Sequence, residues 1–382
     1  VGLFTVASIV CGASPALWLL VVGRVGQGLG AAVMMALSLA LVGDAVPKDR
    51  AGRAMGFLGT MSAVGTALGP SLGGVLLAGF GWRSIFFLNV PLGLLALVLA
   101  LASLPADPPR GARVAFDAVG SALLALTLAA YALSMTLGAS GAVGLALLAV
   151  AVVGAAAFAW VETRVAAPLV RLALFRDRAV SAGFAMSALV TTVAMTTLVV
   201  GPFYLARALG MSPASVGLVM TAGPLVAALA GVPAGRAVDR FGARGVTIAG
   251  LAAMALGCVA LMLLPMASGV VGYVLPLVAV TAGYATFQAA NNTAVVAATD
   301  ATQRGVVSGV LNLSRNLGLV TGASAMGAVF ALGTRAPEVA MASASAIAAG
   351  LHVAFGVAAA LVMGALALAV RTAAPARAMA TS

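Results

Sequence analysis

Residues 56–74 read GFLGTMSAVGTALGPSLGG, a stretch of nineteen residues without a charged side chain. The stretch lies inside a longer apolar run at 54–79. An α-helix of about 20 apolar residues is long enough to cross the hydrocarbon of a bilayer. The run therefore predicts a glycine-rich, membrane-spanning helix.

Further apolar runs of similar length lie on both sides of this one. They lack the apolar–polar alternation of barrel strands, and helices satisfy their own backbone polar groups in lipid. Arg24 and Arg315 are the only charged residues well inside them. We therefore expect an all-α membrane protein with twelve visible spans, the first of them incomplete. The other eleven runs lie near 1–13, 16–43, 84–104, 118–137, 142–161, 180–206, 213–235, 245–265, 270–297, 305–333 and 343–370.

Composition also predicts a lipid environment. Hydrophobic residues make up 63% of the chain and charged residues 8%, against about half and about a quarter in soluble domains. The net charge of +11 comes from arginines scattered between apolar runs, which argues against nucleic acid as a partner. The two cysteines lie in apolar runs and predict no disulfide. The sequence contains no metal-ligand cluster, catalytic triad or phosphate-binding loop, so we expect neither an enzyme nor a bound cofactor.

The basic residues are distributed unequally between alternate connections. If the loop at 44–53 is cytoplasmic, fifteen basic residues lie on the cytoplasmic side, three lie on the opposite side and two lie in the membrane. Such an asymmetry is what the positive-inside rule predicts. We expect a multi-pass protein of a bacterial inner membrane.

An internal repeat relates the third run to the eleventh. Glycines of the third run recur after a shift of 253 residues: Gly52, Gly56, Gly65, Gly69 and Gly74 pair with Gly305, Gly309, Gly318, Gly322 and Gly327. Repeats of this kind are typical of secondary transporters.

The shift leaves the seventh and eighth runs without partners unless two helices precede Val1. It predicts fourteen spans in three parts: 1–104, the remnant of an N-terminal bundle; 105–178, an inserted helix pair with its linkers; and 179–382, a C-terminal six-helix bundle and tail.

Three motifs resemble those of a known family. The first is an antiporter motif made of Gly56, Gly65, Gly69, Pro70, Gly73 and Gly74. The second, at 20–32, contains Arg24 and Gln27, and the third is the loop GRAVDRFGAR at 235–244, in which Ala243 departs from the usual basic residue. Together they resemble the major facilitator superfamily, and within it the fourteen-span drug:proton antiporters of the EmrB/QacA type. The resemblance runs from Val1 to about residue 333.

The resemblance implies proton-coupled export through alternating access. It gives Arg24, with Gln27, a role in proton coupling beside an acidic residue on a first helix that this chain lacks. Arg24 lies about 12 Å along its helix from the outer end, where a charge is costly unless it faces a cavity or a partner. Snorkelling toward the interface is the alternative.

The antiporter motif also has a direct physical interpretation. Gly65, Gly69 and Gly73 are spaced four apart, so they form a helix face without side chains that a neighbouring helix can approach closely. Pro70 lacks an N–H and predicts a bend. Ordinary helix packing is the alternative for the glycines alone.

The loop that contains Asp239 is a candidate cytoplasmic gate. We expect its carboxylate to pair with Arg304 and with the start of the helix beside Arg304, whose dipole favours an anion. The other candidate gate residues are Gly235, Arg240, Gly242 and Arg244. An ordinary solvated turn is the alternative.

Two polar helix faces are the candidate substrate cavity. Helical spacing groups Tyr284, Phe287, Gln288 and Asn291 on one face, and Asn312, Arg315 and Asn316 on another. Phe203 and Tyr204 are predicted to add aromatic surface. Hydrogen bonding between helices without ligand contact is the alternative.

These features together predict an exporter of drug-like or amphipathic small molecules, often cationic, that works as a monomer and draws its energy from the proton gradient. A dedicated exporter of a self-made metabolite or antibiotic is the second hypothesis. A membrane scaffold or sensor without transport activity is the third, and it needs neither Arg24 nor the full glycine pattern.

Overall fold

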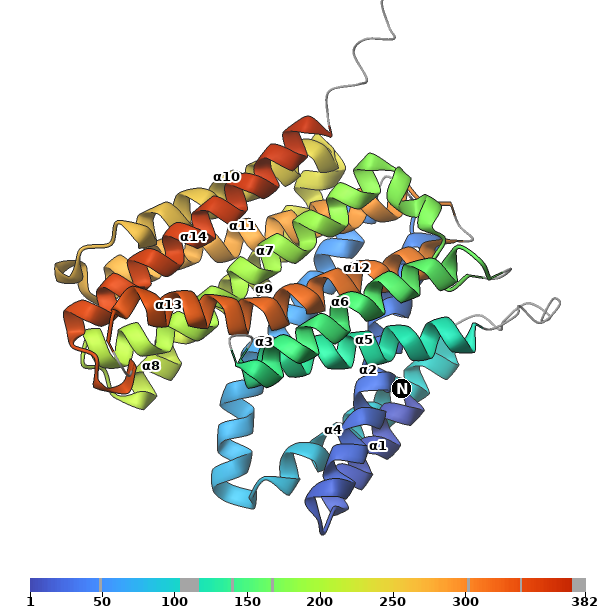
Figure 1. Ribbon diagram of the computed structural model, residues 1–382, viewed down its shortest axis with the longest axis horizontal. Helices are drawn as coiled ribbons and strands as arrows, with labels where there is room; N and C mark the ends of the chain where they lie inside the picture. Colours follow the sequence, from blue (N-terminus) through green and yellow to red (C-terminus); the bar gives the residue numbers. More distant parts are fainter. Residues whose placement is uncertain are drawn as a thin grey trace, which may run out of the picture.

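A computed structural model of the chain describes residues 1–47, 50–103, 117–138, 141–165, 168–300, 303–336 and 339–372. Within these residues the regular structure is helical and no strand occurs. Figure 1 shows the helices as a bundle of long rods, with α1, α2 and α4 grouped at one corner. The expected all-α fold is confirmed for the described residues.

The first half of the chain contributes six helices. Their bounds are α1 Gly2–Ala13, α2 Leu17–Ala45, α3 Ala51–Phe80, α4 Arg83–Ser103, α5 Ala118–Leu137 and α6 Ala142–Glu162. Each covers one of the first six runs predicted from the sequence. For α3, the structure describes the backbone but not the side chains at several positions, among them 66–71 and 73–75.

The second half begins with a 3₁₀ turn at Leu172–Arg176 and contains π-helical segments at Tyr204–Ala208 and Gly322–Met326. The run predicted at 213–235 is divided at Thr221 into two helices, and the second π segment separates the two helices of the run at 305–333. The helices are α7 Arg178–Phe203, α8 Pro213–Met220, α9 Ala222–Phe241, α10 Ala243–Met262, α11 Gly269–Ala297, α12 Arg304–Thr321, α13 Gly327–Thr334 and α14 Ala344–Arg371.

Ten helical segments of the described chain are long and apolar enough to cross a membrane, and Gly2–Ala13 is a shorter apolar helix. Many apolar side chains face outward from them: Leu101 on α4 is 77% exposed and Val153 on α6 is 67% exposed. In water this surface would be costly, whereas lipid accommodates it. The chain is therefore a multi-pass membrane protein. The count of fourteen spans stays a prediction.

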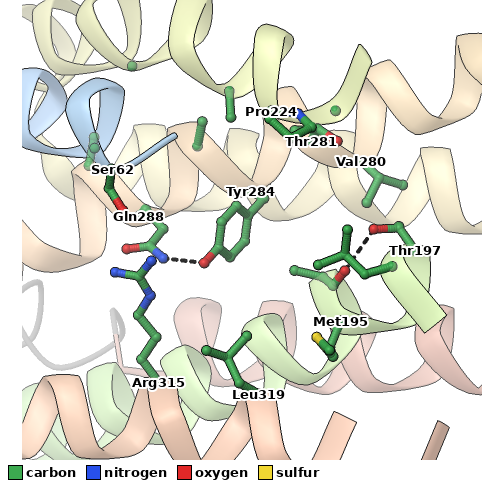
Figure 2. Close-up of a pocket in the computed structure, with 18 of the residues that line it drawn as sticks. Ser62, Met195, Thr197, Pro224, Val280, Thr281, Tyr284, Gln288, Arg315 and Leu319 are labelled. Carbon is green, nitrogen blue, oxygen red and sulfur yellow. Dashed lines mark hydrogen bonds between the residues drawn. The ribbon is translucent and has the colours of Figure 1, made fainter. Parts of the chain in front are cut away.

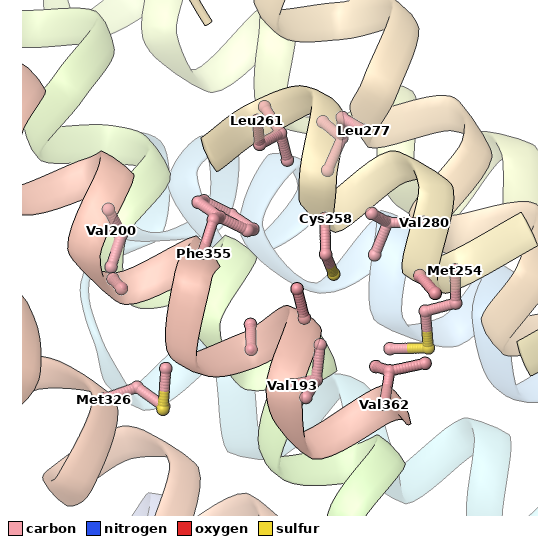
Figure 3. Close-up of a cluster of buried hydrophobic side chains, with 14 of the residues drawn as sticks. Val193, Val200, Met254, Cys258, Leu261, Leu277, Val280, Met326, Phe355 and Val362 are labelled. Atoms are coloured by element: carbon pink, nitrogen blue, oxygen red, sulfur yellow. The ribbon is translucent and has the colours of Figure 1, made fainter. Parts of the chain in front are cut away.

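The main hydrophobic core lies in the second half, where α7, α10, α11 and α14 meet (Figure 3). Its centre is closely packed through glycine. A Cβ placed on Gly250 of α10 would lie 2.9 Å from the carbonyl oxygen of Gly283 on α11, and a Cβ on Gly283 would lie 2.6 Å from that of Gly250. The two helix backbones touch where neither residue has a side chain, as in other small-residue contacts between membrane helices.

Substitution of Gly250 by alanine should therefore separate α10 from α11. We expect the variant to unfold at a lower temperature in detergent, with a loss of roughly 1–3 kcal/mol from overpacking. Gly364→Ala is the matched control, because this glycine of α14 has nothing within 4 Å of the added atom. Equal unfolding temperatures for the two variants would contradict the contact.

Helices α5 and α6 form an antiparallel hairpin. The Ser134 hydroxyl donates to the Gly144 carbonyl oxygen at 2.7 Å, which joins the two helices near their connection. At the other end, buried Asp117 accepts from the Gly120 amide at 2.7 Å and so caps α5. The hairpin contacts α12 and the π segment after it, where the hydroxyl of Tyr131 hydrogen-bonds that of Thr321.

Candidate functional site

A cavity of about 280 Å³ lies between α3 of the first half and α7, α9, α11 and α12 of the second half (Figure 2). Apolar side chains form most of its wall, and a few polar groups converge on it. This composition is typical of small-molecule sites. Elements from both halves of the chain therefore border the same space.

The polar wall comes mainly from α11. The Nε2 group of Gln288 donates to the Tyr284 hydroxyl at 2.5 Å, one helical turn away. Thr281 and Asn292 extend this face by one turn on either side, and all four residues line the cavity. Tyr284 and Gln288, both predicted for the substrate cavity, thus lie in the lining of this cavity.

Arg315 of α12 reaches the cavity from the opposite wall. Figure 2 shows its guanidinium pointing toward Gln288. Of the residues that the structure describes around the cavity, Arg315 alone carries a charge. The predicted cavity role of Arg315 agrees with this position.

Two residues predicted for the α11 face lie elsewhere. Asn291 is 2% exposed, and its Nδ2 group donates to the carbonyl oxygen of Gly183 on α7 at 3.1 Å. Phe287 is 2% exposed and packs in the core beside Gly250 of α10. The prediction was wrong for both because spacing gives an angle around the helix but not the neighbour at that depth. At the level of Asn291, α7 already covers the face.

Four other cavity candidates are also outside the lining. Asn316 is exposed and donates to the backbone carbonyl of Asn312 at 2.9 Å. Tyr204 is fully buried against Tyr273, with ring centroids 5.7 Å apart, and Phe203 stacks on Phe330 at 5.7 Å. The two aromatic side chains thus pack against other rings, and the Nδ2 group of Asn312 is buried without a hydrogen-bond partner among the described residues.

At the end of the cavity toward the basic loops, α3 and α9 touch, and both Gly56 and Gly231 belong to the lining. A Cβ on Gly56 would collide with the carbonyl oxygen of Gly231 and lie 3.0 Å from the Cα of Gly235. A Cβ on Gly231 would meet the Thr60 hydroxyl and lie 2.7 Å from the carbonyl oxygen of Gly56. The glycines of the two helices thus close the bundle where its two halves meet.

The antiporter motif is only partly used in this way. The close approach predicted at Gly65 is not seen among the described residues, none of which has an atom within 4 Å of a Cβ placed there. The surroundings of Gly69, Pro70, Gly73 and Gly74 lie outside the described residues. The backbone is helical from Ala51 to Phe80, through the proline.

Asp239 lies at the same closed end. Its Oδ2 atom accepts a hydrogen bond from the backbone amide of Arg53 at 3.0 Å. Arg53 is the third residue of α3, so the carboxylate of α9 caps the first turn of a helix from the other half of the chain. A helix start was predicted as a partner of Asp239, and the structure places the carboxylate at the start of α3. The predicted pairing with Arg304 stays a prediction.

The rest of the predicted gate loop shapes the turn between α9 and α10. Gly242 ends α9 with φ of 81°, a conformation that favours glycine. The Arg240 guanidinium stacks over the Phe241 ring at 5.1 Å, and Arg244 is exposed in the first turn of α10. Gly235 belongs to the α3–α9 contact.

Arg24 and Gln27 form a separate polar cluster on α2. Arg24 donates to the Oε1 atom of Gln27 at 2.6 Å, and the Nε2 atom of Gln27 donates to the Ser8 hydroxyl on α1 at 2.8 Å. Gln27 is 4% exposed. The two candidates for proton coupling are thus in direct contact, and neither lines the cavity.

The contribution of α3 and α9 to the cavity was not predicted from the sequence. Gly59 and Ser62 of α3, and Gly223, Pro224 and Ala227 of α9, line it. One signal was available on α11: Thr281, Tyr284, Gln288 and Asn292 are spaced three or four apart. For α9, the run of small residues indicates that another helix approaches closely, but it does not identify that helix as α3.

Comparison with known proteins places the chain among transporters. A sequence profile of the Major Facilitator Superfamily matches residues 1–202 and 180–377. The multidrug resistance protein Stp of Mycobacterium tuberculosis is 33% identical over 337 residues, which cover 87% of this chain and 62% of Stp. The riboflavin transporter RibZ of Clostridioides difficile is 30% identical over 329 residues, which cover 86% of this chain and 72% of RibZ. The chain thus spans less than two thirds of the length of Stp.

The fold also resembles a solved transporter. The proton:xylose symporter XylE superposes with a TM-score of 0.61 at 16% identity, over 95% of this chain and 79% of XylE. At this identity the likeness concerns the fold alone.

Proposed function

The chain belongs to the major facilitator superfamily, and on that premise we propose that it exports drug-like or amphipathic small molecules in exchange for protons. The observation that carries the proposal is the cavity, which is bordered by both halves of the chain and lined by apolar residues with a few converging polar groups. Similarity to a multidrug resistance protein supports the export of drugs. In this proposal the protein acts as a monomer in a bacterial inner membrane.

Alternating access would use the contact between α3 and α9 as a gate. We assign the end with the basic loops to the cytoplasm on the positive-inside rule. The contact at Gly56 and Gly231 and the cap from Asp239 to Arg53 would then close the cytoplasmic side. Opening requires both to separate.

The coupling proton would act at the Arg24 cluster. The Arg24 guanidinium donates to the side-chain amide of Gln27 at 2.6 Å and has no carboxylate partner in the described residues. A positive charge in this position would be a suitable neighbour for an acidic group that gains and loses the proton. The fourteen-span architecture of the EmrB/QacA type belongs to the same proposal.

A dedicated exporter of one metabolite is the second candidate. The similarity to a protein named a riboflavin transporter favours it, because the identity is close to that with Stp. The two candidates differ in the breadth of substrates that the cavity accepts.

Resistance profiling of a pump-deficient bacterium that expresses the protein tests the proposal. We expect resistance to several unrelated amphipathic compounds, at least fourfold above the vector control, and its loss when a protonophore collapses the gradient while cellular ATP is held constant. Resistance to a single compound would favour the dedicated exporter. Resistance to none, from a protein present in the membrane, would contradict drug export.

A further inference from the structure

We propose that the cavity selects small organic anions with an apolar body, and that the Arg315 guanidinium is the group that selects them. The inference rests on the proposed function, since it names the substrate class of the same cavity. It departs from the expectation of cationic substrates drawn from the sequence. Three features of the cavity carry it: the depth of the charge, the supply of donors and the apolar wall.

Arg315 lies deep in the membrane without an anionic partner. It follows Arg304, the first residue of α12, by eleven positions, which is about 16 Å along a helix and near the middle of a hydrocarbon layer about 30 Å thick. It is partly buried, and the described residues that line the cavity with it include no carboxylate. A charge at this depth is costly and normally faces a cavity or a partner.

Two of the polar groups around the cavity offer hydrogen-bond donors to a ligand. Arg315 offers N–H donors and no acceptor. The Tyr284 hydroxyl already accepts from Gln288, so its own proton is available to a ligand. An anionic group on a ligand accepts hydrogen bonds from these donors, and its negative charge pairs with the positive charge of Arg315. Planar carboxylates suit the guanidinium in particular, because they can accept two parallel hydrogen bonds.

The rest of the wall suits an apolar body. Met195, Leu198, Met220, Leu277 and Leu319 line the cavity around the polar groups. Thioether side chains adapt to ligands of different shape. A cationic ligand would place a second positive charge beside Arg315, and the described lining offers no carboxylate to balance it.

Binding of three matched fluorescent ligands to the purified protein in detergent tests the inference. They are a diethylaminocoumarin carboxylate, its uncharged carboxamide and an analogue with a quaternary ammonium group. Fluorescence anisotropy should show that the carboxylate binds at least tenfold more tightly than the carboxamide, and the ammonium analogue most weakly. Arg315→Gln should remove the carboxylate's advantage and leave the carboxamide unchanged, whereas Arg315→Lys should retain part of it.

Arg178→Gln is the control, because Arg178 is an exposed arginine at the start of α7. It should leave all three affinities unchanged. Equal affinity for carboxylate and carboxamide, tighter binding of the ammonium analogue, or binding of none of the three would overturn the inference. If Arg315→Gln does not fold, the test rests on the unsubstituted protein, in which the ratio of the carboxylate affinity to the carboxamide affinity supports or overturns the inference.

The binding assay is independent of the export test. Export of cationic compounds with no preference for the carboxylate would leave the proposed function standing and reject the anion site. Carboxylate binding that depends on Arg315, without resistance in cells, would support the anion site and contradict drug export.

Discussion

Substitution of Gly56 by alanine is expected to abolish export and destabilise the protein, whereas the same substitution at Gly65 is expected to change neither. The added methyl group at Gly56 would collide with a backbone oxygen of α9, which cannot rotate away. Overpacking of this kind costs roughly 1–3 kcal/mol. The cost falls on a contact between the two halves, which also meet where α2 packs on α12 and α3 on α11. At Gly65, no atom of the described residues lies within 4 Å of the added methyl group.

The two variants share a helix and a motif, so they form a matched pair. Resistance in cells measures export, and unfolding in detergent measures stability. Motif membership alone predicts equal sensitivity, and the structure predicts at least a tenfold difference in resistance. If Gly65→Ala were as damaging as Gly56→Ala, the packing assigned to α3 would be wrong.

Neutralising Asp239 is expected to open the cytoplasmic side of the cavity. Asp239→Asn keeps an oxygen near the Arg53 amide but removes the charge that interacts with the N-terminus of α3. Such charge–dipole and charge-assisted contacts contribute about 1–2 kcal/mol, which corresponds to about a tenfold shift between closed and open states. Asp239→Ala removes the acceptor too and should shift the equilibrium further.

Labelling by a membrane-impermeant maleimide measures the opening. A cysteine at Gly59 would line the cavity, and the native Cys11 and Cys258 are fully buried. In inside-out vesicles, Asp239→Asn should raise the labelling rate at this cysteine about tenfold. Asp177→Asn is the control, because Asp177 caps the start of its own helix through the amides of Ala179 and Val180. Equal rates in the two variants would exclude a gating role for Asp239.

The helices could be predicted from the sequence because their signal is local. Length and hydrophobicity decide whether a segment spans lipid, and each predicted run coincides with a helical segment of the structure. The breaks were not predicted. The division of α8 from α9 at Thr221 and the π segment at 322–326 depend on neighbours that hydropathy does not describe.

The cavity could be predicted only in part, because it depends on which helices are neighbours at each depth. Helical spacing predicts Tyr284, Gln288 and Arg315 at the cavity, where they lie. Asn291 is predicted on the same face of α11 as Tyr284 and Gln288, but it meets α7 instead. The internal repeat has the same limit. Gly56 is crowded and its repeat partner Gly309 is not, while Gly65 is open and its partner Gly318 lies against α7. Equivalent positions in a repeat need not have equivalent partners.

The α5–α6 hairpin rests on α12 and the π segment through Tyr131 and Thr321. A hairpin that is attached to only one half of the bundle follows that half, and it restrains rotation between the two halves very little. If the two halves rotate as proposed, a hairpin attached in this way would travel with the second half and leave the α3–α9 contact unhindered.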